Sequence, residues 1–220
     1  MQNQDLTGIF ITFEGGEGAG KSTHIKLLAQ RLESAGREVL CLREPGGTAI
    51  GEQLREILLD PENDAMSERA ELLIFEAARA QIIDQVIRPA LARGAVVLCD
   101  RFYDSTVAYQ AYGRGLDRSF VDAANGFAVD GIHPDRTILL VTGGAAQVGL
   151  DRAATTGAAD RMELAGLDFH QRVNEGFLSL AQQQPERVRL VQSAASIEET
   201  AGLVWSQIED LFPQIAKQDA

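Results

Sequence analysis

The segment of residues 15–22, GGEGAGKS, constrains this chain more than any other feature of its sequence. It fits the pattern G-x-x-x-x-G-K-[ST], in which glycines let several backbone N–H groups point at one phosphate. Its context fits as well. Residues 9–13 are β-branched and aromatic like a buried strand, and apolar residues recur at helical spacing after Ser22. A chance glycine-rich turn lacks this context, so the sequence predicts a phosphate site at a strand–loop–helix junction.

Two side chains at the end of this segment have expected tasks. Lys21 would reach the β- and γ-phosphates of a bound nucleotide, because its ammonium group neutralises their charge. The Ser22 hydroxyl would hold Mg²⁺.

The charge of the chain limits its partners. With 20 Lys and Arg against 32 Asp and Glu, the net charge is −12, which argues against a nucleic-acid polymer or an anionic membrane as partner. No apolar run is long enough to span a bilayer, and the polar residues 1–7 lack a signal core. We therefore expect a cytoplasmic protein. Cys41 and Cys99 lie in apolar runs and are expected to be buried.

Strand-like and helix-like stretches alternate along the chain. Apolar runs predict strands at residues 9–13, 38–43, 95–100, 137–141 and 188–191. Helical spacing predicts helices after the glycine loop and at residues 50–59, 67–93 with a kink or break at Pro89, 105–112, 119–128, 145–152 and 167–183. Ser196 and Glu199 form a capping box for a last helix that ends near Pro213. This alternation indicates an α/β protein with a five-stranded parallel sheet covered on both faces.

Polar residues follow two further strands, where ligands bind in such sheets. They are residues 43–48, REPGGT, and the run that begins with Asp100 and Arg101. Asp100 could hold Mg²⁺ through water or orient an acceptor phosphate, or it could cap the next turn. Arg101 is a planar fork suited to a phosphate, although an arginine there is more often solvated or ion-paired.

Phe75 and Arg79 lie four residues apart on one face of a predicted helix. An aromatic ring and a guanidinium group in this arrangement could sandwich and read a nucleotide base. Taken alone, the pair is more typical of a core phenylalanine beside an arginine that reaches to the surface.

Together these stretches resemble the bacterial thymidylate kinases, which are P-loop nucleoside monophosphate kinases, over nearly the whole chain. The resemblance rests on residues 13–15, 20–23, 43–48, 100–102, Ser105, 108–110, 113–115, 134–135, 160–163 and 168–169. It implies a single domain over residues 1–220 with the three-layer α/β/α P-loop NTPase fold and a short lid at about residues 152–162. It also implies a homodimer that phosphorylates dTMP to dTDP with ATP and Mg²⁺, by in-line transfer of the γ-phosphoryl group, for dTTP synthesis.

The resemblance assigns roles by position. ATP would contact Gly15, Gly16, Glu17, Gly18, Ala19, Gly20, Lys21, Ser22 and Thr23. The metal would lie near Ser22, Asp100 and Glu17. For dTMP, the expected contacts are Glu17, Pro45, Phe75, Arg79, Arg101, Ser105, Thr106, Tyr109 and Gln110. The expected catalytic residues are Lys21, Asp100, Arg101, Arg152 and Arg161.

Within the dTMP set, each contact has an expected part. Phe75 would stack on thymine, and Arg79 with Thr106 would bond its edge. Tyr109 would lie near C2′ of the sugar and favour deoxyribose. Pro45 is expected to follow a cis peptide bond that shapes the wall. Glu163, after the lid, is a weaker candidate for the metal and substrate region.

The lid departs from the family pattern. Ala154, Thr155 and Thr156 stand where related lids often carry further arginines, so Arg152 and Arg161 would have to suffice, or turnover would be slow. An arginine aimed at the transferring phosphoryl group contributes on the order of 10³-fold to rate. Thr142 stands where the family usually has an aspartate.

Three alternatives stay open at this stage. The chain could be a kinase for another nucleotide or for a nucleoside. It could be a GTPase-type switch, although it lacks the guanine-reading Asn-Lys-x-Asp motif. It could also bind nucleotides without catalysis, as the arginine-poor lid alone would suggest.

Overall fold

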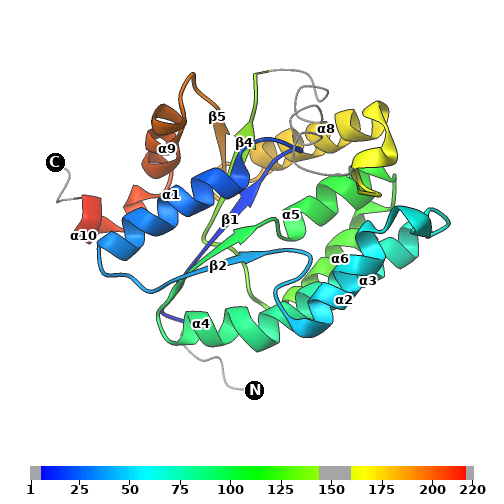
Figure 1. Ribbon diagram of the computed structural model, residues 1–220, viewed down its shortest axis with the longest axis horizontal. Helices are drawn as coiled ribbons and strands as arrows, with labels where there is room; N and C mark the ends of the chain where they lie inside the picture. The colour runs from blue at the N-terminus through cyan, green and yellow to red at the C-terminus, as the bar shows by residue number, and fades with distance from the viewer. Residues whose placement is uncertain (1–5, 144–159, 217–220) are drawn as a thin grey trace.

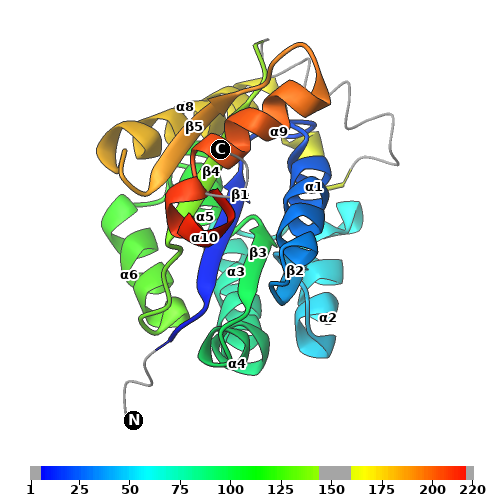
Figure 2. The ribbon, with the colours of Figure 1, turned by 90° about the vertical axis from the view of Figure 1, so that its left-hand side faces the viewer.

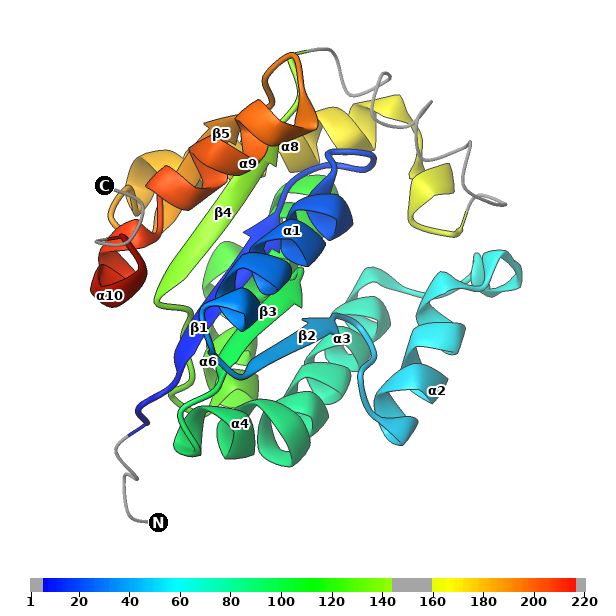
Figure 3. The ribbon, with the colours of Figure 1, turned by 60° about the vertical axis from the view of Figure 1, so that its left-hand side comes forward.

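The structure is a computed structural model that describes residues 6–143 and 160–216. A five-stranded parallel sheet in the order β2-β3-β1-β4-β5 forms its centre (Figure 3). The strands are β1 (Ile9–Glu14), β2 (Val39–Arg43), β3 (Val96–Asp100), β4 (Arg136–Val141) and β5 (Val188–Gln192). The predicted α/β class and the five-stranded parallel sheet are therefore confirmed.

Helices connect the strands. The α-helices are α1 (Lys21–Ser34), α2 (Ala49–Leu59), α3 (Glu68–Ile82), α4 (Arg88–Ala92), α5 (Tyr103–Thr106), α6 (Arg118–Val129), α8 (Leu167–Gln183), α9 (Ile197–Ser206) and α10 (Pro213–Ala216) (Figure 1). Single 3₁₀ turns lie at Pro61–Asn63, Glu163–Ala165 and Glu209–Leu211, and π-helical turns at Ile83–Ile87 and Val107–Gly113. No helix within residues 6–143 and 160–216 is long and apolar enough to cross a membrane.

Helices cover both faces of the sheet, as the alternation of its side chains requires. On one face, Ile11 and Phe13 of β1 pack with Leu28 of α1 and Val204 of α9. On the other, Phe10 packs with α3, α4 and the π-helical turn between them, and Leu139 of β4 packs with α6 and α8. Figure 2 shows α1 and α9 on the opposite side of the sheet from α6 and α8. The result is the expected three-layer α/β/α arrangement.

The register of the sheet brings the predicted motifs to one edge. Asp100 pairs with Phe13 of β1 on one side and with Arg43 of β2 on the other. Because all strands run in parallel, the segments that follow these three residues leave the sheet at the same end. The glycine loop, the segment 43–48 and Asp100 with Arg101 are therefore neighbours in space, although they lie far apart in the sequence.

The structure differs from the sequence-based expectation at several elements. The predicted break at Pro89 is a π-helical turn that joins α3 to α4, which places the proline in the first turn of α4, where it needs no N–H partner. The last predicted helix ends at Ser206 rather than near Pro213, although its capping box at Ser196 is present. The predicted helix at 145–152 lies outside the described residues.

The two cysteines differ in burial because their strands occupy different positions in the sheet. Cys99 of the central strand β3 is fully buried, as predicted. Cys41 is exposed, so the expectation that it is buried is wrong. The reason is that β2 is an edge strand, and an edge strand is covered less completely than a central one.

Candidate active site

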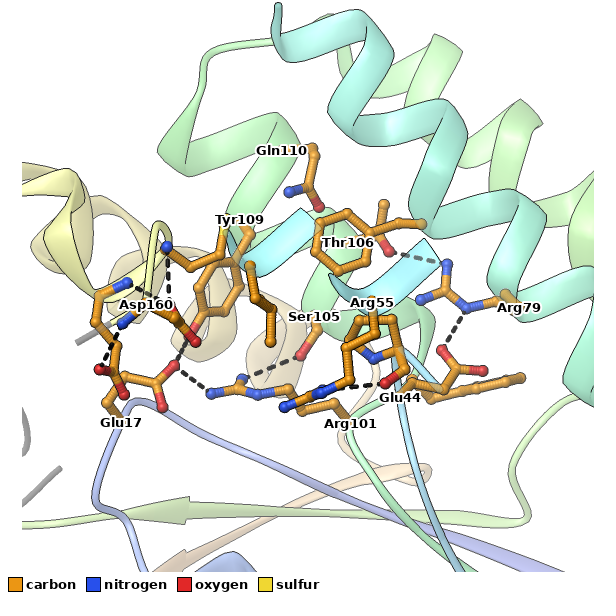
Figure 4. A pocket seen from close by; sticks show the side chains of 16 residues that line it. Glu17, Glu44, Arg55, Arg79, Arg101, Ser105, Thr106, Tyr109, Gln110 and Asp160 are labelled. Carbon is orange, nitrogen blue, oxygen red and sulfur yellow. Dashed lines mark hydrogen bonds and ion pairs between the residues drawn. The ribbon is translucent and has the colours of Figure 1, made fainter. Parts of the chain in front are cut away.

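A cavity opens beside the carboxyl ends of β1, β2 and β3, with about 720 Å³ of empty space, open solvent included. Figure 4 shows its wall from close by. It is lined by Glu17, Glu44, Pro45, Arg55, Leu59, Phe75, Arg79, Arg101, Phe102, Ser105, Thr106, Tyr109, Gln110, Asp160, Met162 and Glu163. All nine residues expected to contact dTMP are in this set, so the structure brings them together around one space.

One end of the cavity is built around Arg79 of α3, whose side chain is 2% exposed. Its Nε donates to Glu44 Oε2 at 2.9 Å, and its Nη1 donates to Glu76 Oε1 and to Thr106 Oγ1, each at 2.9 Å (Figure 4). A further bond from Nη1 reaches Asn125 Oδ1 at 3.1 Å. Two carboxylates and two neutral acceptors therefore hold the guanidinium group, and its charge is neutralised within the protein.

The wall beside Arg79 is partly apolar. Phe75 is half-buried on α3, and Tyr109 is 5% exposed in the π-helical turn. The peptide bond between Glu44 and Pro45 is cis, as predicted. Arg55 of α2 donates from Nη1 to the Pro45 carbonyl oxygen at 3.0 Å, which holds α2 against this turn.

Glu44 is fully buried, and one of its oxygens, Oε1, has no hydrogen-bond partner within the described part of the chain. Burial raises the pKa of its carboxyl group to about 7, although Arg79 favours the charged form. This end of the cavity is thus a low-dielectric environment in which charge is tightly balanced.

At the other end, Arg101 has a backbone φ of 70°, which an L residue rarely adopts. Its N–H donates to the Phe13 carbonyl oxygen at 2.9 Å. Its Nη2 contacts Glu17 Oε1 at 2.6 Å, and its Nη1 donates to Gly15 O and Ser105 Oγ, each at 3.2 Å (Figure 4). The chain therefore turns sharply at Arg101 and directs the guanidinium group across the mouth of the glycine loop.

Glu17 is the internal partner of Arg101. It also accepts a hydrogen bond from Tyr109 OH at 2.8 Å. Burial disfavours its charge, but Arg101 and Lys21 outweigh burial and lower the pKa of the carboxyl group to about 2. Glu17 is therefore ionised throughout the physiological range and pairs with the charge of Arg101.

The glycine loop forms the neighbouring cavity, which has about 990 Å³ of empty space, open solvent included, and shares Glu17, Glu44, Arg55, Arg101 and Glu163 with the first. Lys21 Nζ donates to the carbonyl oxygens of Gly15 at 3.2 Å and Gly16 at 3.1 Å. At Gly15, φ is 135°, and an added Cβ would lie 2.2 Å from the Leu140 carbonyl oxygen. Only glycine fits there, which explains this residue of the motif.

Two of the predicted metal ligands lie in contact. Ser22 Oγ donates to Asp100 Oδ2 at 2.8 Å, at the floor of the loop cavity. Within residues 6–143 and 160–216, no group of three or more His, Cys, Asp or Glu side chains could hold a metal by itself. Mg²⁺ does not require one, because it keeps several waters and shares one or two protein ligands with substrate phosphates. The donor set therefore fits Mg²⁺ that arrives with a nucleotide.

Arg161, which is expected to be catalytic, is bound to protein partners in this structure. Its side chain is 9% exposed, its Nη1 lies 2.7 Å from Glu71 Oε2, and its Nε donates to the Leu58 carbonyl oxygen at 2.8 Å. Glu71 also binds Arg114 and Gln110. Arg161 is therefore held by buried Glu71 and is not among the residues that line either cavity. Arg152 and most of the predicted lid lie outside the described residues.

Sequence reasoning missed several residues of the site. Arg55 lines both cavities, and Glu14, Glu44 and Glu71 are buried carboxyl groups around them. Glu14 carried a signal, because a carboxylate at the end of an apolar strand must find partners when it is buried. Glu44 lay in the stretch 43–48 that the sequence singled out, but its pairing with Arg79 was not predicted, and Arg55 and Glu71 carried no signal.

Comparisons with known proteins agree with this geometry. A family profile described as Thymidylate kinase matches residues 13–203. The thymidylate kinase of Geobacter sulfurreducens is 51% identical over 213 residues, which cover 94% of this chain and 99% of that protein. The thymidylate kinase of Geotalea uraniireducens is 47% identical over 91% of this chain and 96% of its own. A crystal structure of the thymidylate kinase from Ehrlichia chaffeensis superposes with a TM-score of 0.74 at 32% identity, covering 92% and 98% of the two chains.

Proposed function

The chain belongs to the thymidylate kinase family and converts dTMP to dTDP with ATP, and from this premise we propose how its residues divide the work. The cavity around Arg79 is the dTMP site, and the cavity over the glycine loop is the ATP site. The observation that carries this assignment is the place of Arg101, which lines both cavities and spans the boundary between them. In-line phosphoryl transfer needs such a shared boundary, because the acceptor oxygen must face the γ-phosphate.

At the closed end, Phe75 stacks on thymine and Arg79 hydrogen-bonds the edge of the base. The Nη2 group of Arg79 has no hydrogen-bond partner among the described residues, whereas Nε and Nη1 are occupied. A base acceptor can therefore bind Nη2 without breaking an existing bond. Thr106 keeps Nη1 in place, and Gln110 and Pro45 complete the wall.

In the middle of the cavity, Tyr109 lies beside the sugar. Its hydroxyl group is held by Glu17 at 2.8 Å, and its ring packs edge-on against Phe169 and Phe177. A ring held from two sides leaves no room to yield to a 2′-hydroxyl group, so the site prefers deoxyribose. The Glu17 carboxylate accepts a hydrogen bond from the 3′-hydroxyl group of the sugar.

Arg101 and Arg55 bind the acceptor phosphate, with Ser105 as a neutral donor. Both arginines line both cavities. Arg55 donates one hydrogen bond to the Pro45 carbonyl oxygen and retains free N–H groups. To bind the phosphate, Arg101 turns from Glu17 to the substrate. This exchange replaces one anion by another and leaves the arginine neutralised at each stage.

The glycine loop, residues 15–23, binds the phosphates of ATP. Lys21 exchanges its two carbonyl partners for β- and γ-phosphate oxygens. Ser22 and Asp100 hold Mg²⁺, with Glu17 nearby, and the metal neutralises charge on the phosphates when bound. Arg152 is our candidate for the lid arginine, whereas Arg161 stabilises the wall. We treat residues 1–220 as one domain with its lid at about 152–162.

We also propose that the enzyme works in the cytoplasm as a homodimer. Helix α6 presents two large aromatic side chains to solvent on one face, Phe120 at 53% exposed and Phe127 at 89%. Exposed aromatic pairs of this kind are typical of contact surfaces. Light scattering of the wild type and of Phe127→Glu tests this, since the charge would shift a dimer to a monomer.

The experiment that tests the assignment is ADP release with ATP and Mg²⁺ and a panel of acceptors: dTMP, dUMP, dCMP, dGMP, AMP, ribothymidine monophosphate and shikimate. We expect a strong preference for dTMP. In Tyr109→Ala, the preference for dTMP over ribothymidine monophosphate should shrink about tenfold, and Tyr109→Phe is the matched control that keeps the ring. An unchanged sugar preference in Tyr109→Ala would remove Tyr109 from its role.

A further inference from the structure

Glu14 is a buried carboxyl group to which the proposed function gives no task. It is the last residue of β1 and is fully buried. Its Oε1 accepts hydrogen bonds from Phe102 N at 2.7 Å and Ser105 N at 3.2 Å, and its Oε2 accepts from Ser105 Oγ at 2.6 Å. A single side chain therefore holds both ends of the turn that carries Arg101.

Ser105 connects Glu14 to the cavity. Its hydroxyl group lies between the Glu14 carboxyl group and the guanidinium group of Arg101, with Oγ 3.2 Å from Arg101 Nη1. Ser105 lines the cavity (Figure 4), whereas Glu14 is fully buried and is not among the lining residues. The hydroxyl group has one hydrogen, which it can donate either to Glu14 or to a ligand in the cavity.

The surroundings of Glu14 allow its carboxyl group to gain or lose a proton near neutral pH. Burial and the charge of Asp104 raise the pKa of its carboxyl group to about 7, against the opposing effects of Arg101 and of the hydrogen bonds from the Ser105 side chain and the Phe102 backbone. Other titratable groups on the surrounding elements interact electrostatically with the Glu14 carboxyl group. They are Lys21, Cys99, Tyr103, Tyr109 and Arg187. A dianionic phosphate placed at Arg101 adds negative charge nearby.

We propose that Glu14 is a positioning residue that takes up one proton when the acceptor monophosphate binds. In the same step, Ser105 turns its hydroxyl hydrogen from Glu14 to a phosphate oxygen. This inference rests on the proposed place of the acceptor phosphate at Arg101.

Every proton in this step is accounted for. Before binding, Glu14 is a carboxylate and Ser105 donates to it. A proton from solvent then binds Glu14 Oε2, and the new O–H donates to Ser105 Oγ, so the hydrogen bond survives with its direction reversed. The Ser105 hydrogen is released for the phosphate, and the two backbone N–H bonds to Oε1 are unchanged. The turn keeps its shape, and the site gains a donor where the ligand brings charge.

The test is calorimetry of ligand binding to the full chain at pH 8, in buffers with different enthalpies of ionisation. At this pH a phosphate monoester, with a second pKa of about 6, is a dianion and brings no proton of its own. The dependence of the heat on the buffer then counts the protons taken up by the protein. We expect the uptake to approach one proton per dTMP and to be close to zero for thymidine, which fills the base and sugar positions without a phosphate.

Two variants identify the group that is protonated. Glu14→Gln, which has the same shape, should abolish the uptake while dTMP still binds. Glu44→Gln is the matched control, because Glu44 is another buried carboxyl group whose pKa is raised to about 7, and it should leave the proton uptake per bound dTMP intact. Ser105→Ala should weaken dTMP about tenfold, the usual effect of one hydrogen bond to a charged group, and thymidine much less.

The outcomes separate this inference from the proposed function. Uptake with thymidine, uptake that persists in Glu14→Gln, or uptake lost in Glu44→Gln would each overturn the role of Glu14 and leave the dTMP site standing. If Glu14→Gln does not fold, the contrast between dTMP and thymidine in the wild type, with Ser105→Ala, still decides. Failure of the wild type to bind dTMP would instead overturn the proposed site itself.

Discussion

The two ends of the cavity that we propose for dTMP hold their arginines in different ways. At the base end, Arg79 is 2% exposed and tied to four acceptors, two of them carboxylates. At the phosphate end, Arg101 is 16% exposed and binds Glu17, the Gly15 carbonyl oxygen and Ser105. In the proposed function, the first set of contacts persists when dTMP binds, whereas the contact between Arg101 and Glu17 in the second set is replaced by a phosphate.

This difference separates stability from activity. Contacts that persist contribute to the folded state before any ligand arrives, so a change at the base end should appear in the free energy of unfolding. At the phosphate end, a substitution that keeps the cationic charge, and with it an ion pair to Glu17, should instead appear chiefly in kinetics, because the lost contacts are those made to the bound and transition states. Substitutions at the two ends test this difference.

The largest effect is expected at the phosphate end, from Arg101→Lys. Lysine keeps the charge but not the planar fork, so it cannot bind a phosphate and Ser105 in the present geometry. We expect kcat/KM for dTMP to fall by about 10³-fold, as for other arginines at a transferring phosphoryl group. The free energy of unfolding should change much less. The assay is steady-state ADP release beside urea unfolding.

A matched control for that variant is Arg93→Lys. Arg93 pairs with Glu38 on the surface, and both side chains are about half exposed. Neither its kinetics nor its stability should change measurably. A loss of stability in Arg101→Lys as large as its loss of activity would show that the Arg101 side chain chiefly stabilises the fold. That result would contradict its proposed role in binding the phosphate.

The next effect lies at the base end and should appear mainly as lost stability. Arg79→Met leaves Glu44 and Glu76 buried without their cationic partner. Removing one member of a buried ion pair costs about 3 kcal/mol or more, so the urea midpoint should fall well below that of the wild type. Arg93→Met serves as the surface control, with a loss below about 1 kcal/mol. An Arg79→Met protein of wild-type stability would refute the view that this network is complete without ligand.

Stability should also respond to pH in opposite directions at the two ends. The pKa of Glu44 is raised to about 7, so the folded state binds more protons than the unfolded state between pH 4.5 and 7, and stability falls as pH rises through that range. The pKa of Glu17 is lowered to about 2, so its contribution is complete above pH 4.5 and is lost as pH falls toward 2.

Each of these shifts corresponds to a change on the order of 3 kcal/mol. Urea unfolding of Glu44→Gln and Glu17→Gln from pH 3 to pH 8 measures both. The difference from wild type should vary between pH 4.5 and 7 only in Glu44→Gln, and below pH 4.5 only in Glu17→Gln. Parallel curves for the two variants would mean that neither carboxyl group has the environment described here.

The sequence predicted what local pattern determines. The glycine loop, the ends of β1 and β3 and the capping box at Ser196 depend on residues within a few positions of one another, and all are present. The position of each strand in the sheet was harder to predict, because the alternation of strands and helices does not reveal which strand lies at the edge. Cys41 was misplaced for that reason.

Partners of buried charges were the least predictable part of the site. Arg161 is held by Glu71, and Glu14 holds Ser105, in each case across long stretches of chain. The residue types alone are compatible with many pairings. A buried carboxylate at the end of an apolar strand signals that some partner exists, but only the folded chain identifies it.

The smallest effect is expected from Thr106→Val, which tests whether the base end is redundant. Valine has nearly the shape of threonine but removes the hydroxyl group that accepts from Arg79 Nη1 at 2.9 Å. Since Nη1 keeps Glu76 and Asn125 as partners, the loss of stability should be about 1 kcal/mol, that of one hydrogen bond. The KM for dTMP should rise less than about tenfold, with kcat unchanged, because binding and transition states lose the same contact. Thr106→Ser, which keeps the hydroxyl group, should restore both values. A kcat that falls with KM unchanged would mean instead that Arg79 must move during catalysis, and the base end would then resemble the phosphate end.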